Sequence, residues 1–283
     1  MEPPPDFPRA HGRVPPGTWS DDGAQALCLL ASLLECHRLD LPDFSAKLLA
    51  WYEQGYLAVD GIVFDVGVQT GRAIRALTGG AEPRVAGPAE EHDNGNGSLM
   101  RVLPLALWHT GDDAALVHDA YEQSRVTHGH ARSRVCCAIY CLWVRRTLDG
   151  DADAWAAATS TLRAMLVPGS DEEEALEWHV RPDDALRDTR RGERAEGSGS
   201  GYVIDTLRSA RQVAGAHDSY EGIVKAAVAL GNDTDTTACV AGGLAGVRHG
   251  EGGIPERWRS ALRGRELVDP LVEALVAARR GER

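Results

Sequence analysis

Apolar residues recur at three- and four-residue spacing along most of this 283-residue chain, and that spacing is typical of α-helices. The first such stripe begins after Ser20 and runs through Ala24, Leu27, Ala31 and Leu34. Alternation with period two, which marks a half-buried strand, is almost absent, and the short run 61–65 is its nearest case. Alanine and leucine, both good helix formers, dominate these stretches. The sequence therefore predicts an all-α fold, a compact multi-helix bundle.

The same spacing predicts ten further helices, and the segments between them define the organisation of the chain. The first 17 residues contain six prolines and are expected to form an irregular lead-in. Residues 18–283 are then expected to form a single domain. The charged, glycine-rich segment 187–201 predicts a loop inside that domain. The ten predicted helices lie near 43–54, 67–78, 98–109, 112–124, 131–148, 151–166, 202–214, 219–230, 234–248 and 266–280.

The net charge and the cysteines indicate where the protein is located and which classes of partner it has. The 30 Lys and Arg residues against 42 Asp and Glu give a net charge of −12, which repels a phosphate backbone and suits a protein that gathers divalent cations. No apolar run approaches the roughly 20 residues of a membrane span, and the start lacks a signal-peptide pattern. The six cysteines form no Cys-x-x-Cys pair and predict buried free thiols. We therefore expect a soluble cytoplasmic protein with neither a membrane nor a nucleic acid as partner.

Hydroxyl and carboxylate side chains gather immediately before the first apolar stripe, at Ser20, Asp21 and Asp22. Such residues are typical helix caps, because their oxygens accept hydrogen bonds from free backbone amides and their charge suits the positive end of the helix dipole. The same oxygens are the ligands that Mg²⁺ and Mn²⁺ prefer. Taken alone, this cluster favours a cap and leaves a metal site as the alternative.

A second oxygen-rich cluster, at residues 231–237, contains Asp233, Asp235 and Thr236 ahead of another helical stripe. Capping needs only one or two of these side chains, so the alternation of aspartates and hydroxyls exceeds what a cap requires. If the two clusters converge, they would form a two-metal site with shared carboxylates. The spacing alone does not establish that convergence.

Two further polar stretches precede predicted helices. The glycine-rich segment 93–101 has backbone amides that could hold a phosphate, although such a loop is more often an ordinary turn. Thr127, His128, Gly129 and His130 precede the helix at 131–148. Two histidines without further ligands are typical of a loop or cap, and we predict no zinc site there.

In this order the clusters resemble the ADP-ribosylglycohydrolase family, which includes the dinitrogenase-reductase-activating glycohydrolases. The resemblance spans roughly residues 17–260. Each motif alone is weak, but five in the same order are a specific signal, and Trp51–Leu57 and Phe64–Gly67 look like a bacterial branch. The matching stretches are Gly17-Thr-Trp-Ser-Asp-Asp, Asn96-Gly-Ser-Leu-Met-Arg-Val-Leu-Pro, Thr127-His-Gly-His, Gly201-Tyr-Val-Ile-Asp and Gly231-Asn-Asp-Thr-Asp-Thr.

The resemblance implies an all-α fold with a binuclear Mg²⁺ or Mn²⁺ centre and assigns roles by motif position. The two sets of metal ligands would be Ser20, Asp21 and Asp22, and Asp233, Asp235 and Thr236. Asp21, Asp22 and Asp235 would also act in catalysis. The ADP-ribose site would be lined by the loop near the diphosphate, by one histidine and by a tyrosine stacked on adenine: Asn96, Gly97, Ser98, His128 and Tyr202.

The reaction implied is hydrolysis of the N- or O-glycosidic bond at C1″ of the distal ribose, which releases ADP-ribose. The partner is then an ADP-ribosylated protein or a small ADP-ribose conjugate, with arginine favoured as the acceptor. Metal ions would hold the ribose hydroxyls and a water, while carboxylates position that water and take its proton. Two divalent ions would also reverse the local sign of charge, so that an acidic pocket accepts an anion.

The chain departs from the family pattern at its start. Family members begin with an apolar helix followed by an acidic residue of the site, and nothing upstream of Ser20 matches it. Glu2 and Asp6 lie among prolines and are poor substitutes, while Asp65 and Glu53 are better candidates. Three explanations stay open: a start upstream of Met1, a substitute carboxylate, or a relative that does not hydrolyse.

Two smaller departures lie in the motifs themselves. Gly23 replaces a threonine that usually follows the first acidic pair. Asp93 stands where a small residue is usual and is expected to repel a phosphate.

The sequence thus predicts a metal-dependent ADP-ribosyl hydrolase. The first alternative is an ADP-ribose-binding module without turnover, which the absent first helix favours. The second is a structural protein, since some eye-lens crystallins resemble this family. The four clustered aspartates argue against a structural role, because a protein with no ligand has no need of them.

Overall fold

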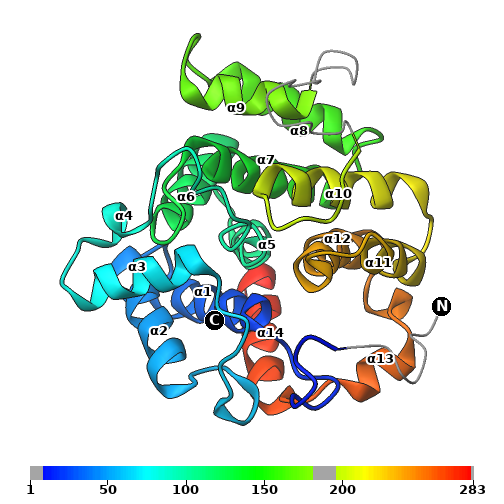
Figure 1. Ribbon diagram of the computed structural model, residues 1–283. Coiled ribbons are helices and arrows are strands. Elements are labelled where there is room, and N and C mark those ends of the chain that lie inside the picture. The colour runs from blue at the N-terminus through cyan, green and yellow to red at the C-terminus, as the bar shows by residue number, and fades with distance from the viewer. Residues whose placement is uncertain (1–8, 181–195, 282–283) are drawn as a thin grey trace.

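The structure, a computed structural model, describes residues 9–180 and 196–281. Within these ranges all regular structure is helical, and the prediction of an all-α fold is confirmed (Figure 1). The described residues contain one isolated β-bridge, between Gly95 and Tyr202. Glu2, Asp6 and most of the predicted loop 187–201 lie outside the described residues.

The α-helices are α1 (Asp21–Cys36), α2 (Leu41–Gln54), α3 (Val68–Thr78), α4 (Pro83–Ala86), α5 (Leu103–Trp108), α6 (Asp113–Arg125), α7 (Ala131–Leu148), α8 (Ala154–Met165), α9 (Asp171–Val180), α10 (Val203–Ala216), α11 (Tyr220–Ala229), α12 (Thr234–His249), α13 (Glu256–Ala261) and α14 (Arg265–Arg280). Two short 3₁₀ turns, η1 (Val59–Gly61) and η3 (Glu251–Gly253), lie in the connections. No described helix is long and apolar enough to cross a bilayer.

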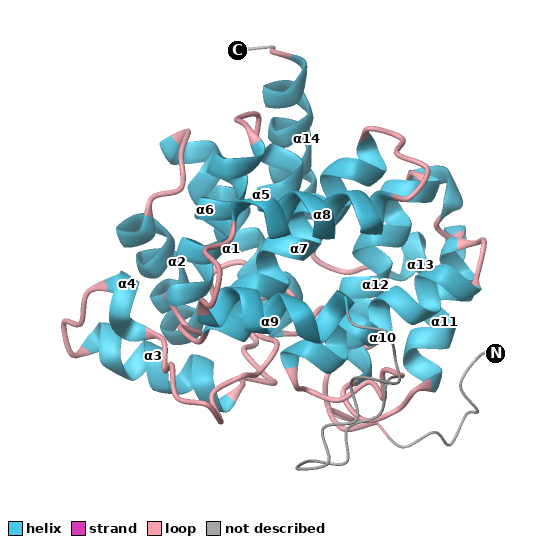
Figure 2. Cartoon of the chain, turned by 90° about the horizontal axis from the view of Figure 1, so that it is seen from above, coloured by secondary structure: helices cyan, strands magenta, loops and turns pink. Residues whose placement is uncertain are grey.

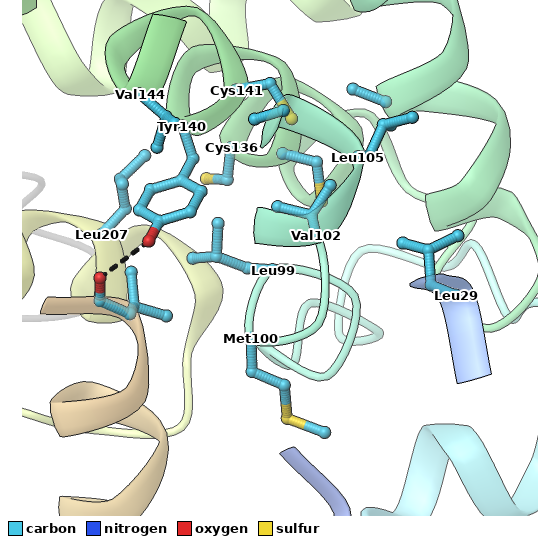
Figure 3. Close-up of a cluster of buried hydrophobic side chains, with 14 of the residues drawn as sticks. Leu29, Leu99, Met100, Val102, Leu105, Cys136, Tyr140, Cys141, Val144 and Leu207 are labelled. Carbon is cyan, nitrogen blue, oxygen red and sulfur yellow. Dashed lines mark hydrogen bonds between the residues drawn. The ribbon is translucent and has the colours of Figure 1, made fainter. Parts of the chain in front are cut away.

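Helix α7 packs against helices on several of its sides. It contacts α6, α8, α9 and α10 on its outer sides, and α5 and α12 towards the middle of the molecule (Figure 1). The Tyr140 hydroxyl donates a hydrogen bond to the Val240 carbonyl of α12 at 2.9 Å, so a polar tip inside the core is satisfied. Figure 3 shows the apolar cluster around this contact, made by Leu29, Leu99, Met100, Val102, Leu105, Cys136, Tyr140, Cys141, Val144 and Leu207.

All six cysteines are free, as predicted. Four of them are buried and two are partly buried. Burial raises the pKa of the Cys28 thiol to about 12, so this sulfur packs as a small apolar group rather than as a thiolate. The buried thiols are Cys28, Cys136, Cys137 and Cys141.

Helices α1 and α12 come from opposite ends of the chain and contact each other inside the bundle. Seen from above, α2, α3 and α4 lie on one side of the molecule and α10, α11 and α13 on the other, with α1 and α7 between them (Figure 2). Helix α1 is buried from Leu27 to Leu33 against α2, α5 and α14. This packing fixes where its N-terminus points.

The prediction of a helix over 98–109 is wrong for its first half, because α5 begins only at Leu103. Pro104 has no N–H to donate to the Met100 carbonyl, which is the bond a helix would need there. That carbonyl instead accepts from the Cys239 thiol, at 3.6 Å. Residues 98–101 form turns, and this irregular stretch borders the polar cavity described below.

Candidate active site

The first turn of α1 carries two buried carboxylates, Asp21 and Asp22, each only 5% exposed. Ser20 occupies the N-cap position but makes no capping hydrogen bond with its side chain. Its hydroxyl donates instead to Oδ2 of Asp22 at 2.7 Å. The side chain of Ser20 therefore does not cap the helix, and its hydroxyl is held against a carboxylate of the same cluster.

The first turn of α12 repeats this arrangement. Asp233 stands at the N-cap without capping the helix, and Asp235 and Thr236 follow within the first turn. Oδ2 of Asp233 accepts a hydrogen bond from Nδ2 of Asn96 at 2.8 Å. Nδ2 of Asn96 also donates to Oγ1 of Thr206 at 3.0 Å. The asparagine predicted to line a diphosphate site thus orients one of the clustered carboxylates.

The two helix starts converge, and their carboxylates repel one another. Burial raises the pKa of Asp21 well above the usual carboxyl range, and the negative charges of Asp22 and Asp65 raise it further. Burial followed by the charge of Asp235 does the same to the pKa of Asp22. Burial also raises the pKa of Asp233, against the hydrogen bond from Asn96. The cluster holds more negative charge than its surroundings can stabilise.

These side chains suit a hard divalent cation. Oδ1 of Asp22 is buried and has no hydrogen-bond partner, so one carboxylate oxygen is left for a ligand. Among the described residues, no three His, Cys, Asp or Glu side chains already stand as a closed ligand cluster. Part of the donor set consists of the Ser20 and Thr236 hydroxyls, which suit Mg²⁺ and Mn²⁺. The residues present fit such an ion.

Two cavities meet at these carboxylates. The smaller has a volume of about 300 Å³ and the larger of about 1010 Å³, and Asp65 and Asp233 line both. Asp21 and Thr236 face the smaller cavity, whereas Asp22 and Asp235 face the larger one. The acidic cluster therefore lies at the boundary between the two cavities.

The smaller cavity has the features of an anion site. Gly67 and the first residues of α3 line it, so free backbone amides at the start of that helix border the space. Gly95, Gly97 and His128 line it as well. A Cβ at Gly97 would lie 2.8 Å from Cε1 of His128, so only glycine fits there. Burial lowers the pKa of His128 to about 3, so its ring is neutral at ordinary pH.

The larger cavity is wider and has mixed chemistry. Trp19 and Phe64 supply aromatic surface, while Arg9 and His11 bring basic groups from the lead-in. Gly23 borders it as well, and a Cβ at that position would lie 2.8 Å from the Trp19 side chain. That close contact explains why glycine replaces the usual threonine there.

Asp65 is the better placed of the two candidate substitute carboxylates. It lines both cavities, and its Oδ2 lies 3.2 Å from Nε2 of His11. Its backbone is left-handed, with φ of +61°, a conformation that non-glycine residues adopt rarely. Glu53, the other candidate, is exposed on α2 and lines neither cavity.

Some predicted residues lie beside the cavities rather than in them. Ser98 is buried, and its hydroxyl accepts from Ser124 at 2.9 Å. Tyr202 stands at the N-cap of α10 and lines neither cavity, so its stacking on adenine stays a prediction. Nδ1 of His130 accepts from the Arg132 amide at 3.2 Å, the expected capping role. Asp93 is buried against Arg72 at 2.6 Å, which offsets the charge expected to repel a phosphate.

Three polar residues of the site were not predicted from the sequence. Gln69 and Thr70 line the smaller cavity, and Oε1 of Gln69 accepts from the Gly95 amide at 2.5 Å. Arg101 is fully buried behind the Asn96–Ser98 loop and reaches Gln25 of α1 at 3.0 Å. Arg101 belongs to the matching stretch that begins at Asn96, and a charged residue within the otherwise apolar run 99–103 was the signal available.

The sequence of the chain is similar to those of known proteins. The model of the ADP-ribosylglycohydrolase family matches residues 2–283. The ADP-ribosylarginine hydrolase Tri1 of Serratia proteamaculans is 30% identical over 270 residues, which cover 93% of this chain and 68% of Tri1. The ADP-ribosyl-dinitrogen reductase glycohydrolase of Rhodospirillum rubrum is 29% identical over 250 residues, which cover 88% of this chain and 75% of that protein.

A solved structure gives the same result. A chain of an "ADP-ribosylglycohydrolase-related protein complex" superposes with a TM-score of 0.72 at 31% sequence identity. The superposition covers 96% of this chain and 87% of that one. The likeness therefore extends over the whole bundle rather than over one motif.

Proposed function

The chain belongs to the ADP-ribosylglycohydrolase family of hydrolases, and we propose that it cleaves the glycosidic bond between ADP-ribose and a modified protein side chain. Arginine is the acceptor we favour, because Tri1 and a second Tri1 from Pseudomonas putida, 27% identical to this chain, are named ADP-ribosylarginine hydrolases. The observation that carries the proposal is that the clustered aspartates lie between the two cavities, so that both cavities border carboxylates of the same cluster.

The smaller cavity suits the ADP-ribose moiety. Its glycines let the backbone approach a ligand, and the start of α3 offers amides to a phosphate. Neutral His128 can donate or accept a hydrogen bond without bringing charge. The larger cavity then receives the acceptor side chain, whose guanidinium can stack on the aromatic surface of Trp19 and Phe64.

We propose that the site holds two Mg²⁺ or Mn²⁺ ions. Ser20, Asp21 and Asp22 would provide one ligand set, and Asp233, Asp235 and Thr236 the other. Bound there, divalent ions would supply positive charge that stabilises oxygen ligands, namely the ribose hydroxyls and a water.

The chain's own residues would prepare the reaction at C1″. Asn96 holds Asp233 in place through its 2.8 Å hydrogen bond, and Gln25 holds Asp21 at 3.2 Å. Asp65 borders both cavities, so its carboxylate can take a proton from a water that attacks C1″. The bond from C1″ to the acceptor nitrogen breaks, and the proton taken up then passes to the departing side chain.

The first experiment measures release of free ADP-ribose from an arginine-ADP-ribosylated protein, with Mn²⁺ and then with chelator. Metal-dependent release is the expected result. The variant Asp235→Ala should lose metal-dependent ADP-ribose binding and keep its helical CD signal. Asp218→Ala, at an exposed aspartate before α11, is the matched control.

The alternatives predict other outcomes. ADP-ribose binding by calorimetry without any release would indicate a binding module. Neither binding nor release would indicate a structural protein. Unchanged binding in Asp235→Ala would contradict the assignment of the site.

A further inference from the structure

Arg101 is a buried cation that pairs with neutral groups. Its side chain is fully buried and lies over the Phe44 ring, 5.2 Å from the ring centroid. Its guanidinium donates to Oε1 of Gln25 at 3.0 Å, to Oγ1 of Thr127 at 2.7 Å and to the Gln123 side chain at 3.1 Å. None of these acceptors is a carboxylate. A buried charge is costly, so a cation placed among neutral groups calls for a role beyond packing.

A guanidinium can only donate hydrogen bonds, and this property fixes the direction of its neighbours. The Gln25 amide must present its oxygen to Arg101, so its NH₂ group faces the other way. That group donates to Oδ2 of Asp21 at 3.2 Å. Arg101 thereby determines which atom of Gln25 meets a carboxylate of the acidic cluster.

Arg101 also acts on His128, through a hydrogen bond to Thr127. Oγ1 of Thr127 accepts from Arg101 at 2.7 Å and lies 2.8 Å from Nδ1 of His128. The Thr127 side chain is fully buried, and the described residues offer its hydroxyl proton no other acceptor. If Nδ1 carried a proton, the Thr127 hydroxyl would be buried without an acceptor, which is unfavourable. Thr127 therefore donates to Nδ1, and the ring proton resides on Nε2.

Nε2 of His128 borders the smaller cavity. A Cβ at Gly95 would lie 3.5 Å from Nε2, and a Cβ at Gly97 would lie 3.3 Å from it. The ring edge thus faces the glycine loop that lines the space. The N–H on this edge is available to an oxygen of a ligand, and the ring stays neutral because burial lowers its pKa.

We propose that Arg101 is a positioning residue that, through Thr127, holds the His128 proton on Nε2 and makes His128 a permanent hydrogen-bond donor to a phosphate or ribose oxygen in the smaller cavity. Through Gln25, the same guanidinium orients Asp21. The identity of the ligand rests on the proposed function. The tautomer of His128 does not, because it follows from the hydrogen bonds within the chain.

Thr127 offers the clearest test, because its variants leave the guanidinium in place. Thr127→Val keeps the shape of the side chain but removes the hydroxyl, and Thr127→Ser keeps the hydroxyl. Long-range ¹H–¹⁵N NMR of the histidine rings reports which nitrogen carries the proton, and loss of one signal in His128→Gln assigns His128. Calorimetric titration with ADP-ribose in Mn²⁺ gives the affinity of each variant.

The wild-type protein and Thr127→Ser are expected to show the Nε2–H form. Thr127→Val is expected to show a mixture of both tautomers and an affinity for ADP-ribose about tenfold lower. Arg101→Lys, which keeps the charge but loses the fork of donors, should change the ring spectrum in the same direction.

A wild-type spectrum with the proton on Nδ1 would overturn the inference. An unchanged tautomer in Thr127→Val would overturn it as well. If the tautomers behave as expected but the wild-type protein does not bind ADP-ribose, the proposed function fails and the assignment of Arg101 and Thr127 stands.

Discussion

Asp21 and Asp22 should make the metal-free protein less stable as pH rises. Both carboxyls have a pKa in the folded chain above the unfolded value of 3.8, about 9 and about 7. Between pH 3.8 and these folded-state pKa values, the folded state binds more protons than the unfolded state. The stabilisation is fully present below about pH 4 and is lost as pH rises through the folded values, by about 1.4 kcal/mol per pH unit for each proton.

Thermal unfolding in chelator from pH 5 to 9 measures this effect. The unfolding temperature of Asp22→Asn should fall less steeply with pH than that of the wild type, because the variant lacks one of the two groups. Equal slopes for both proteins would contradict the electrostatic account of the cluster.

Asp65→Asn should slow ADP-ribose release by at least about 100-fold while changing ADP-ribose affinity little. Asp65 borders both cavities and is the carboxylate proposed to take the proton of the attacking water. Glu53→Gln is the matched control, because Glu53 was the other candidate and is exposed on α2. Release rates and calorimetry of the two variants separate turnover from binding. Loss of activity in Glu53→Gln with normal turnover in Asp65→Asn would reverse the assignment.

The acidic cluster could be predicted from the sequence, but the network behind it could not. Two oxygen-rich helix starts are visible as local patterns at residues 20–22 and 231–237. The hydrogen bond between Gln25 and Arg101 joins residues 76 positions apart, and the one between Asn96 and Asp233 joins residues 137 apart. No local pattern encodes such pairs, because they depend on how the helices pack.

At the scale of elements, the contact between α7 and α12 controls where the second carboxylate set lies. A Cβ at Gly243 would lie 2.6 Å from the Tyr140 hydroxyl and 2.9 Å from Cδ2 of Leu103. Gly243→Ala should therefore shift α12, destabilise the protein by about 1–3 kcal/mol and weaken metal binding. Gly246→Ala is the matched control on the same helix, since its Cβ would meet only Tyr220, at 4.0 Å. Urea unfolding and Mn²⁺ titration check both variants, and equal losses would contradict the close-packing argument.

Helix positions followed from apolar spacing where packing and local propensity agree. Helix α7 begins and ends at the predicted residues 131 and 148. Helix α9 was missed, because its first turn consists of Asp171 and three glutamates, with little apolar pattern to detect. Helix α13 is only six residues long and has no buried residue among them, so it too lacks an apolar stripe. The start of α5 was misplaced because a hydrophobic run continued through a stretch whose hydrogen bonds Pro104 prevents.

At the scale of the whole molecule, divalent cations should tie together the two ends of the chain. Asp21 and Asp22 begin α1 near one end, while Asp233 and Asp235 stand at the start of α12, more than 200 residues later in the sequence. An ion held by both sets binds only the folded state, because the unfolded chain separates them. At a concentration of 100 times its dissociation constant, such an ion adds about 2.7 kcal/mol to the free energy of unfolding.

That gain should raise the unfolding temperature of the wild-type protein in Mn²⁺ by about 5–10 °C over the value in chelator, because 1 kcal/mol shifts a chain of this size by about 2–4 °C. The net charge of −12 means that any cation screens general repulsion, so the chelator sample must be matched in ionic strength with NaCl. Asp235→Asn removes a proposed metal ligand and should show little of the Mn²⁺ shift, whereas Asp218→Asn, on an exposed loop, should keep it. An equal Mn²⁺ shift in all three proteins would mean that the ions bind at a place that does not involve Asp235, and that α1 and α12 are held together by packing without a shared metal.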